Sequence, residues 1–350
     1  MRADRFLRAC RREAVDATPI WLMRQAGRYL EGFQALRKTH SFLELVHTPE
    51  LAVEISLEPV RRFDLDAAIV FADILLPLEP MGLTLHFEAE GGPRIENPVR
   101  DEEDAGRLRP VDPRDGLGDV LETLRILRQE LGGRVPLIGF AAAPFTLLSY
   151  AVEGETRRDA PSLKALMWGR PALFEALMRR MSEVTVAYLR SQVEAGAQAL
   201  QLFDSWVGAL SPLDYGRHVL PHTQAVIRGL RGTGVPVIHF APLTTSYLDL
   251  VLETGADVLS VDWRADLTSV RREARGRAAV QGNLDPLLLK EGNPAQIREE
   301  ARRILERAGP DAGHIFNLGH GVLPGTPPAH VGILVDAVHT FSALEGRPRR

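Results

Sequence analysis

Residues 136–152 read PLIGFAAAPFTLLSYAV and carry no charged side chain. The segment is short for a membrane span, and Pro136, Gly139 and Pro144 interrupt it. A buried strand that continues into a loop therefore fits these residues better than a transmembrane helix. A strand without a polar face is typical of a parallel sheet that is covered on both sides.

Short apolar runs of this kind recur along the chain. They are Ile20–Met23, Ala67–Phe71, Pro136–Phe140, Ala199–Phe203, Pro236–Phe240, Val258–Val261, Ala278–Val280 and His314–Phe316. Apolar residues at helical spacing lie between them, and we expect helices that begin at Pro49 and that span Val120–Leu131, Ala172–Gln192, Leu213–Leu230, Ser246–Glu253, Leu267–Ala274, Ala295–Ala308 and Pro328–Leu344. This alternation predicts an α/β protein with one domain over residues 1–350, a (β/α)8 TIM barrel, with an open doubly wound sheet as the alternative.

Two parts of the chain lie outside this alternation. An insert after the second strand runs from Pro77 to Asp119, and its Gly91-Gly92-Pro93 sequence predicts a small hairpin near the barrel mouth. At the two ends, residues 1–15 and 345–350 are expected to be flexible.

The composition narrows the class of protein. The 350 residues include 42 Lys and Arg against 46 Asp and Glu, a formal charge of −4 that argues against a dedicated nucleic-acid binder. The lone Cys10 excludes an internal disulfide and any site that needs two thiolates. The first twenty residues mix arginines and acids and hold no apolar signal segment. We therefore expect a reduced, cytoplasmic protein that binds neither membranes nor nucleic acid.

In a barrel of this type the active site is built from residues that directly follow the strands. The polar residues at these positions, with the loop after the third strand, are Arg24, Asp73, Ala141–Tyr150, Asp204-Ser205, His239, Asp262, Asn283 and His320. Polar residues thus follow nearly every apolar run, which predicts an enzyme whose site lies at this end of the sheet.

Arg24 and Arg28 are four residues apart after the first apolar run. In a helix both guanidinium groups would point to one side, and two neighbouring cations need an anion between them. An anionic ligand would meet that need, and so would ion pairs with Glu31 and Glu44.

Asp73 lies in the apolar sequence IVFADILL, residues 69–76. A carboxylate among apolar neighbours must find donors or a cationic partner. A helix cap or a structural ion pair would also explain it.

Ser205, Tyr150 and His320 complete the set of candidates. Ser205 lacks the G-x-S-x-G elbow of a nucleophile, so it is a hydrogen-bond donor to a substrate or an N-cap. His320 lies in NLGHGVLPG, residues 317–325, where glycines can hold the imidazole in a cavity, although a structural histidine fits too. Tyr150 fits a core position as well. No H-E-x-x-H or C-x-x-C sequence is present, so we expect catalysis without a metal. The paired arginines and the other polar residues predict an anionic substrate and acid–base or electrostatic catalysis.

At these residues the sequence resembles the uroporphyrinogen decarboxylase family. The match runs over about three hundred residues and is carried by stretches in the same order. They are Pro19–Leu30 (PIWLMRQAGRYL), Pro59–Phe63, Ala68–Leu75, Gly139–Thr146 (GFAAAPFT), Gln201–Trp206, Gln281–Pro286 and Asn317–Gly321.

The resemblance implies a (β/α)8 barrel, usually a homodimer, that removes CO₂ from the four acetate side chains of uroporphyrinogen III in haem biosynthesis. The product is coproporphyrinogen III, and the family uses neither a metal nor an organic cofactor. The family's functional positions fall on Arg24, Arg28, Asp73, Tyr150, Ser205 and His320. The arginines would clamp substrate carboxylates, Asp73 would stabilise the protonated pyrrole, and the proton donor stays open between an arginine, Tyr150 and a bound water.

The sequence departs from the family pattern at two places. Glu31 replaces a proline that is common after Arg-Tyr-Leu, and Ala241–Thr245 replaces a stretch that usually contains Lys-Gly. Two other functions stay open. A corrinoid-dependent methyltransferase shares this barrel but would need a zinc–thiolate site, which Cys10 alone cannot supply. A non-catalytic porphyrin carrier would keep the arginines without needing Asp73.

Overall fold

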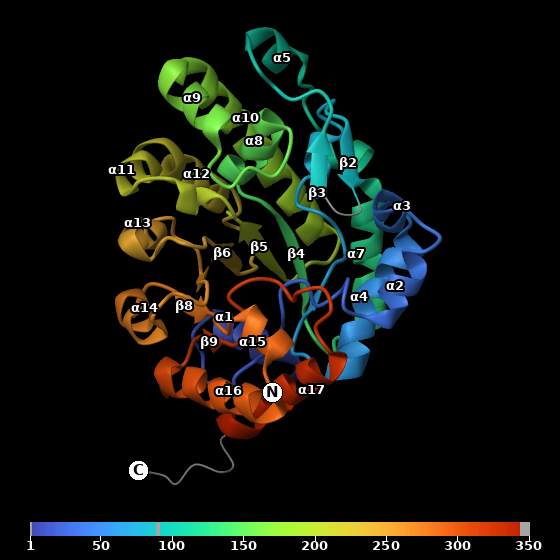
Figure 1. Ribbon diagram of the computed structural model, residues 1–350, viewed down its shortest axis with the longest axis vertical. Coiled ribbons are helices and arrows are strands. Elements are labelled where there is room, and N and C mark those ends of the chain that lie inside the picture. Colours follow the sequence, from blue (N-terminus) through green and yellow to red (C-terminus); the bar gives the residue numbers. More distant parts are fainter. Residues whose placement is uncertain (1, 89–91, 344–350) are drawn as a thin grey trace.

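The computed structural model describes residues 2–88 and 92–343, and a seven-stranded parallel sheet forms its centre (Figure 1). The strands, in the order in which they neighbour one another, are β1 (Ala68–Ile69), β4 (Leu137–Ala142), β5 (Ala199–Phe203), β6 (Val237–Phe240), β7 (Val258–Ser260), β8 (Ala279–Gln281) and β9 (His314–Ile315). All of β4 is buried, and so is every residue of β6 and β7. The apolar runs therefore predicted these strands correctly, because both faces of the sheet are covered.

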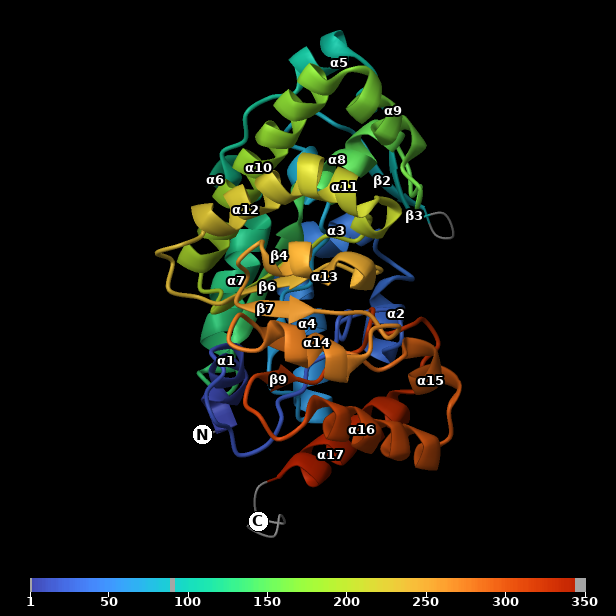
Figure 2. The same ribbon diagram turned by 90° about the vertical axis from the view of Figure 1, so that its left-hand side faces the viewer.

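Helices surround the sheet in both views (Figures 1 and 2). They are α1 (Arg5–Cys10), α2 (Glu31–Leu36), α3 (Phe42–His47), α4 (Pro49–Phe63), α7 (Gly118–Leu131), α8 (Pro144–Glu153), α9 (Pro161–Gly169), α10 (Pro171–Glu194), α11 (Pro212–Asp214), a π-helix (Tyr215–Val219), α12 (Leu220–Gly229), α13 (Leu248–Leu252), α14 (Leu267–Ala274), α15 (Pro286–Glu291), α16 (Pro294–Ala308) and α17 (Pro328–Ser342). On α7, Val120, Leu124, Leu127 and Leu131 are buried, as their helical spacing predicts.

The first predicted strand, Ile20–Met23, does not form. Ile20 makes a single parallel bridge to Phe316, and its carbonyl accepts a hydrogen bond from the backbone N–H of Asp66 at 2.9 Å. Further along, the N–H of Leu22 donates to Gln25 Oε1 and that of Met23 to Asn317 Oδ1, both at 3.0 Å. Side chains take the donors that a strand ladder would need, so the pairing ends after Ile20.

The insert after β1 contains a two-stranded antiparallel hairpin, β2 (Leu85–Glu88) with β3 (Gly92–Ile95). Gly91, which the sequence analysis placed at its turn, lies outside the described residues. Two short helices follow, α5 (Glu102–Arg107) and α6 (Pro113–Gly116). Phe87 and Pro93 of the hairpin line the cavity described below, so the insert forms part of its wall.

The expectation of a flexible N-terminal segment is wrong for most of residues 1–15. In α1, Phe6, Ala9 and Cys10 are fully buried, because residues at helical spacing face the sheet. Arg5 donates from Nη1 to Asp66 Oδ1 at 2.9 Å, so the helix is also held by an ion pair. The predicted flexible C-terminal segment, 345–350, lies outside the described residues.

Candidate active site

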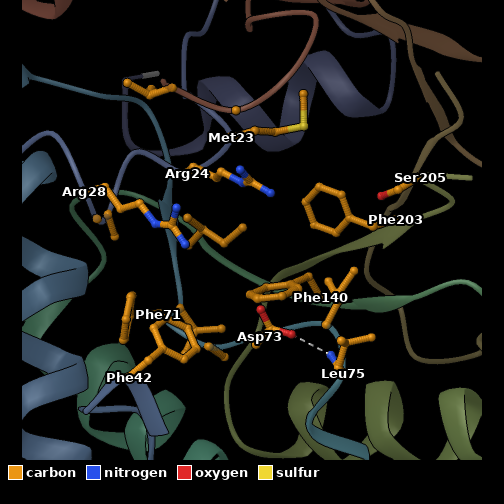
Figure 3. A pocket seen from close by; sticks show the side chains of 18 of the residues that line it. Met23, Arg24, Arg28, Phe42, Phe71, Asp73, Leu75, Phe140, Phe203 and Ser205 are labelled. Carbon is orange, nitrogen blue, oxygen red and sulfur yellow. Dashed lines mark hydrogen bonds between the residues drawn. The ribbon is translucent and has the colours of Figure 1, made fainter. Parts of the chain in front are cut away.

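A cavity opens where the strands β1, β4, β5 and β6 end, and it encloses about 1350 Å³ when the space at its mouth is counted. All six side chains that the family resemblance singles out line this cavity. They are Arg24, Arg28, Asp73, Tyr150, Ser205 and His320. Figure 3 shows the two arginines on one side of the cavity, Asp73 below them and Ser205 on the opposite wall.

Aromatic rings make up much of the remaining wall. Phe140 and Phe203 meet edge to face with 5.6 Å between ring centroids, and Phe203 and Phe240 do so at 6.0 Å. The sequence analysis did not single out these residues, although a phenylalanine ends each of four successive apolar runs, the first at Phe71. Because inward-facing side chains alternate along a strand, this repeat places rings at one level of the cavity. Such a wall suits a ligand with apolar ring faces.

The turn that carries Arg24 is not helical, so the geometric reason for bringing the two arginines together is wrong. Arg24 has a left-handed backbone with φ of 62°, which a non-glycine residue adopts at a cost. Asn317 Oδ1 holds the N–H of Met23, and the N–H of Val322 donates to the carbonyl of Met23 at 2.8 Å. The Arg24 side chain crosses Gly321, where a Cβ atom would lie only 2.4 Å from its Cδ. The neighbouring loop therefore fixes both the turn and the direction of the side chain.

Neither acid that the sequence offered as a partner neutralises these arginines. Glu31 forms an ion pair with Arg62 at 2.6 Å, and Glu44 accepts the N–H of Ser41 in a capping box. Among the described residues, Arg24 and Arg28 form no salt bridge. Burial lowers the pKa of the Arg24 guanidinium, since a desolvated cation without a partner is disfavoured. The site is therefore prepared for an anion.

Asp73 faces the same cavity, and its carboxylate accepts one hydrogen bond, from the N–H of Leu75 to Oδ1 at 2.9 Å (Figure 3). It forms no salt bridge within the described part of the chain, so the structural ion pair that the sequence left open is wrong. Burial raises the pKa of the Asp73 carboxyl to about 6, and the Leu75 N–H and the charges of Arg24 and Arg28 offset only part of that rise. Its second oxygen is left for a ligand.

His320 presents a neutral imidazole to the cavity. Burial, and to a smaller extent the nearby Arg24 charge, lowers the pKa of its ring to about 4. The N–H of Gly321 donates to Nδ1 at 2.8 Å, so the neutral ring carries its proton on Nε2. His320 is therefore a hydrogen-bond donor at neutral pH.

Tyr150 reaches the cavity from α8, which corrects the loop expected over Ala141–Tyr150. β4 continues to Ala142, and α8 begins at Pro144 because proline fits the first turn of a helix. Gly154 ends α8 in a left-handed conformation with φ of 76°. Burial raises the pKa of the Tyr150 hydroxyl, so this group keeps its proton.

Four other polar residues predicted at the strand ends do not line the cavity. Asp204 and His239 are fully buried, and Asp262 accepts the N–H groups of Leu243 and Arg264. Asn283 donates to the carbonyls of Asp262 and Ala265, both at 2.9 Å. The unusual loop Ala241–Thr245 does not line the cavity either. Asp262 and Asn283 thus hold loops in place through these hydrogen bonds.

Comparison with known proteins identifies the family. The family model of uroporphyrinogen decarboxylase matches residues 1–341. Uroporphyrinogen decarboxylase from Sorangium cellulosum is 53% identical over 350 residues, 99% of each chain, and that from Carboxydothermus hydrogenoformans is 50% identical over 341 residues, 97% of each chain. The chain belongs to the uroporphyrinogen decarboxylase family. As a member of this family it is an enzyme, a decarboxylase of porphyrin biosynthesis.

The fold itself is shared more widely than the family. A methyltransferase from Methanosarcina mazei superposes with a TM-score of 0.84 at 23% identity, covering 97% of this chain and 98% of its own. Within residues 2–88 and 92–343, no helix is long and apolar enough to cross a bilayer. In the same residues no group of three His, Cys, Asp or Glu side chains is arranged to hold a metal ion.

Proposed function

We propose that the chain removes CO₂ from the four acetate side chains of uroporphyrinogen III and releases coproporphyrinogen III, without a metal or an organic cofactor. The observation that carries this proposal is a cavity that holds the Asp73 carboxylate and two arginines, none of which forms a salt bridge within residues 2–88 and 92–343. An acidic protein attracts a molecule with eight carboxylates only through such a local cationic site.

Asp73 would act on the charge that the reaction creates. Protonation of a ring carbon turns one pyrrole into a cation, and the electron pair of the broken C–CO₂ bond then flows into that ring. The resulting exocyclic methylene takes up a proton as the ring carbon loses its own, so each step consumes one proton and leaves a methyl group. A carboxylate beside the pyrrole N–H groups stabilises the cationic ring more than the neutral one, and this difference lowers the barrier.

The other five residues would bind and orient the substrate. Arg24 and Arg28 can each hold a carboxylate with two parallel N–H bonds, a geometry that lysine lacks. Ser205 and the Nε2–H of His320 would donate to further carboxylates. The proton would come from an arginine, from Tyr150 or from a bound water; burial lowers the pKa of the Arg24 guanidinium and raises that of the Tyr150 hydroxyl.

Three broader features belong to the same proposal. The parallel sheet would close into a single-domain (β/α)8 barrel, with the segment at Ile20 between β9 and β1 as its eighth member. The chain would work as a homodimer in the cytoplasm, where its lone, buried Cys10 stays reduced. Light scattering of the purified protein gives the assembly state, and a monomeric mass contradicts the homodimer.

Anaerobic incubation with uroporphyrinogen III tests the function directly. After oxidation of the products, chromatography counts the carboxylates left on each porphyrin. We expect a series with seven, six and five carboxylates that ends at four. Binding without loss of carboxylates contradicts the decarboxylase assignment and supports a carrier. A separate incubation with a methylated corrinoid and a thiol that yields the methyl thioether supports the methyltransferase alternative.

A further inference from the structure

A buried hydroxyl behind the cavity wall contacts the turn that presents Ser205. Thr146 on α8 is fully buried and does not line the cavity. Its Oγ1 donates to Asp204 Oδ1 at 3.1 Å and accepts the N–H of Trp206 at 3.4 Å. These contacts fall on the residues directly before and after Ser205. One side chain thus fixes both flanks of the turn.

Asp204 is held from several sides. Its carboxylate is fully buried, and Oδ2 lies 3.5 Å from Nε2 of the equally buried His239. Its backbone N–H donates to the carbonyl of Phe240 at 2.8 Å. Among the described residues the carboxylate accepts only the Thr146 hydroxyl, at Oδ1, and its Oδ2 has no hydrogen-bond partner, so that one bond matters because unpaired burial is costly. Removing the Thr146 hydroxyl would leave Oδ1 without its donor.

Thr146 also connects this turn to Tyr150. The two residues are four apart on α8 and therefore lie on the same side of the helix. The ring of Tyr150 packs against Trp206 with 6.0 Å between centroids and an interplanar angle of 58°. One hydroxyl group thus fixes the turn that presents Ser205 against the helix that presents Tyr150.

We propose that Thr146 is a positioning residue. Its hydroxyl fixes the position of Ser205 relative to Tyr150, and through Ser205 it strengthens the binding of a substrate carboxylate. This inference rests on the proposed function and deepens it. Without the hydroxyl, the Trp206 N–H and Asp204 Oδ1 both lose a buried partner, so the turn shifts to find new ones. The substrate then loses the bond from Ser205 in its ground state.

The variants Thr146→Val and Thr146→Ser separate the hydroxyl from the volume of the side chain. We expect Thr146→Val to raise KM for uroporphyrinogen about tenfold with kcat changed less than about threefold, as for the loss of one charge-assisted hydrogen bond. Thr146→Ser should recover most of that loss. Thr185→Val is the matched control, because Thr185 is a buried threonine on α10 whose hydroxyl donates to the carbonyl of Ala142 at 3.3 Å, outside the turn. It should leave both constants near their wild-type values.

A double-mutant cycle with Ser205→Ala decides whether Thr146 acts through Ser205. In the Ser205→Ala background, Thr146→Val should add less than about twofold to KM. If the two substitutions raise KM by factors that multiply in the double variant, the proposal is overturned. It is also overturned if Thr185→Val raises KM as much as Thr146→Val does. Thr146→Ala provides the same deletion if the valine variant does not fold.

A crystal structure supplies a readout that is independent of activity. In Thr146→Val we expect Ser205 Oγ to move by more than about 1 Å relative to the Tyr150 hydroxyl, a shift large enough to spoil a hydrogen bond. An unmoved Ser205 overturns this inference even if the enzyme is active. A wild-type chain that leaves uroporphyrinogen intact overturns the proposed function instead, so the two failures are distinct.

Discussion

Asp73→Asn should make the protein more stable and almost inactive. The substitution keeps the size of the side chain and removes its charge. Removing one preorganised electrostatic group typically costs about 100- to 1000-fold in kcat, and we expect a loss in that range with KM within about tenfold. Activity is measured from the porphyrin products under anaerobic conditions.

The gain in stability follows from the raised pKa of this carboxyl. An aspartate has a pKa of 3.8 when unfolded, and burial raises the pKa of Asp73 to about 6 in the folded protein. Ionisation therefore disfavours the fold as pH rises from about 4 to about 6, and the full effect is present above that range. This shift of about two pKa units lowers the free energy of unfolding of the wild type by about 3 kcal/mol at pH 8 and by about half of that at pH 5.

Urea unfolding at pH 5 and pH 8 tests this difference. We expect the free energy of unfolding of Asp73→Asn to exceed that of wild type by more at pH 8 than at pH 5. Asp262→Asn is the matched control, because that buried carboxylate accepts two backbone N–H groups and its amide cannot accept both. The control should lose stability at pH 8. A variant of Asp73 that is less stable than wild type at pH 8, or that retains nearly normal kcat, refutes the reasoning.

Three further outcomes can be measured with the same protein. In wild type, kcat/KM should fall as pH drops through about 6, because protonated Asp73 has no charge with which to stabilise the cationic ring; a profile that is flat from pH 5 to pH 8 contradicts this. Arg28→Lys should raise KM by about tenfold, as a lost bidentate pair requires, and an unchanged KM excludes the carboxylate clamp. Arg5→Leu should lower the free energy of unfolding by about 3 kcal/mol, because Asp66 loses its buried cation, while kcat per folded molecule stays the same.

Most of the fold follows from the apolar runs, because a strand buried on both faces needs no polar positions. The sequence pattern fails where side chains replace backbone partners. At Ile20–Met23 the residues are as apolar as in any strand, yet Gln25 and Asn317 take the backbone donors. Gln25 lies three residues from Leu22, but Asn317 lies 294 residues from Met23, so no local pattern reveals the second partner.

That the six candidate residues lie together was also predictable, but the geometry of the cavity was not. The resemblance to a family placed six residues in one site, and all six line one cavity. The helical spacing invoked for Arg24 and Arg28 was wrong, since Arg24 lies in a left-handed turn that Asn317 helps to hold. Thr146 lies inside a quoted motif, but only its contacts to Asp204 and Trp206 set it apart from a core threonine.

The cavity holds charges of both signs without pairing them, and under the proposed function this separation would let one site serve a polyanion whose ring becomes cationic. Arg24 and Asp73 line the same space without forming a salt bridge, and burial disfavours the charged form of each. A direct salt bridge between them would offset the desolvation of both groups, but it would leave neither charge available to bind the substrate. Asn317 and Gly321 fix the arginine turn, and the Leu75 N–H orients the carboxylate, in an arrangement in which the two groups form no salt bridge. Substrate carboxylates would then neutralise the arginines, and the pyrrole N–H groups would satisfy Asp73, most strongly when the ring is protonated.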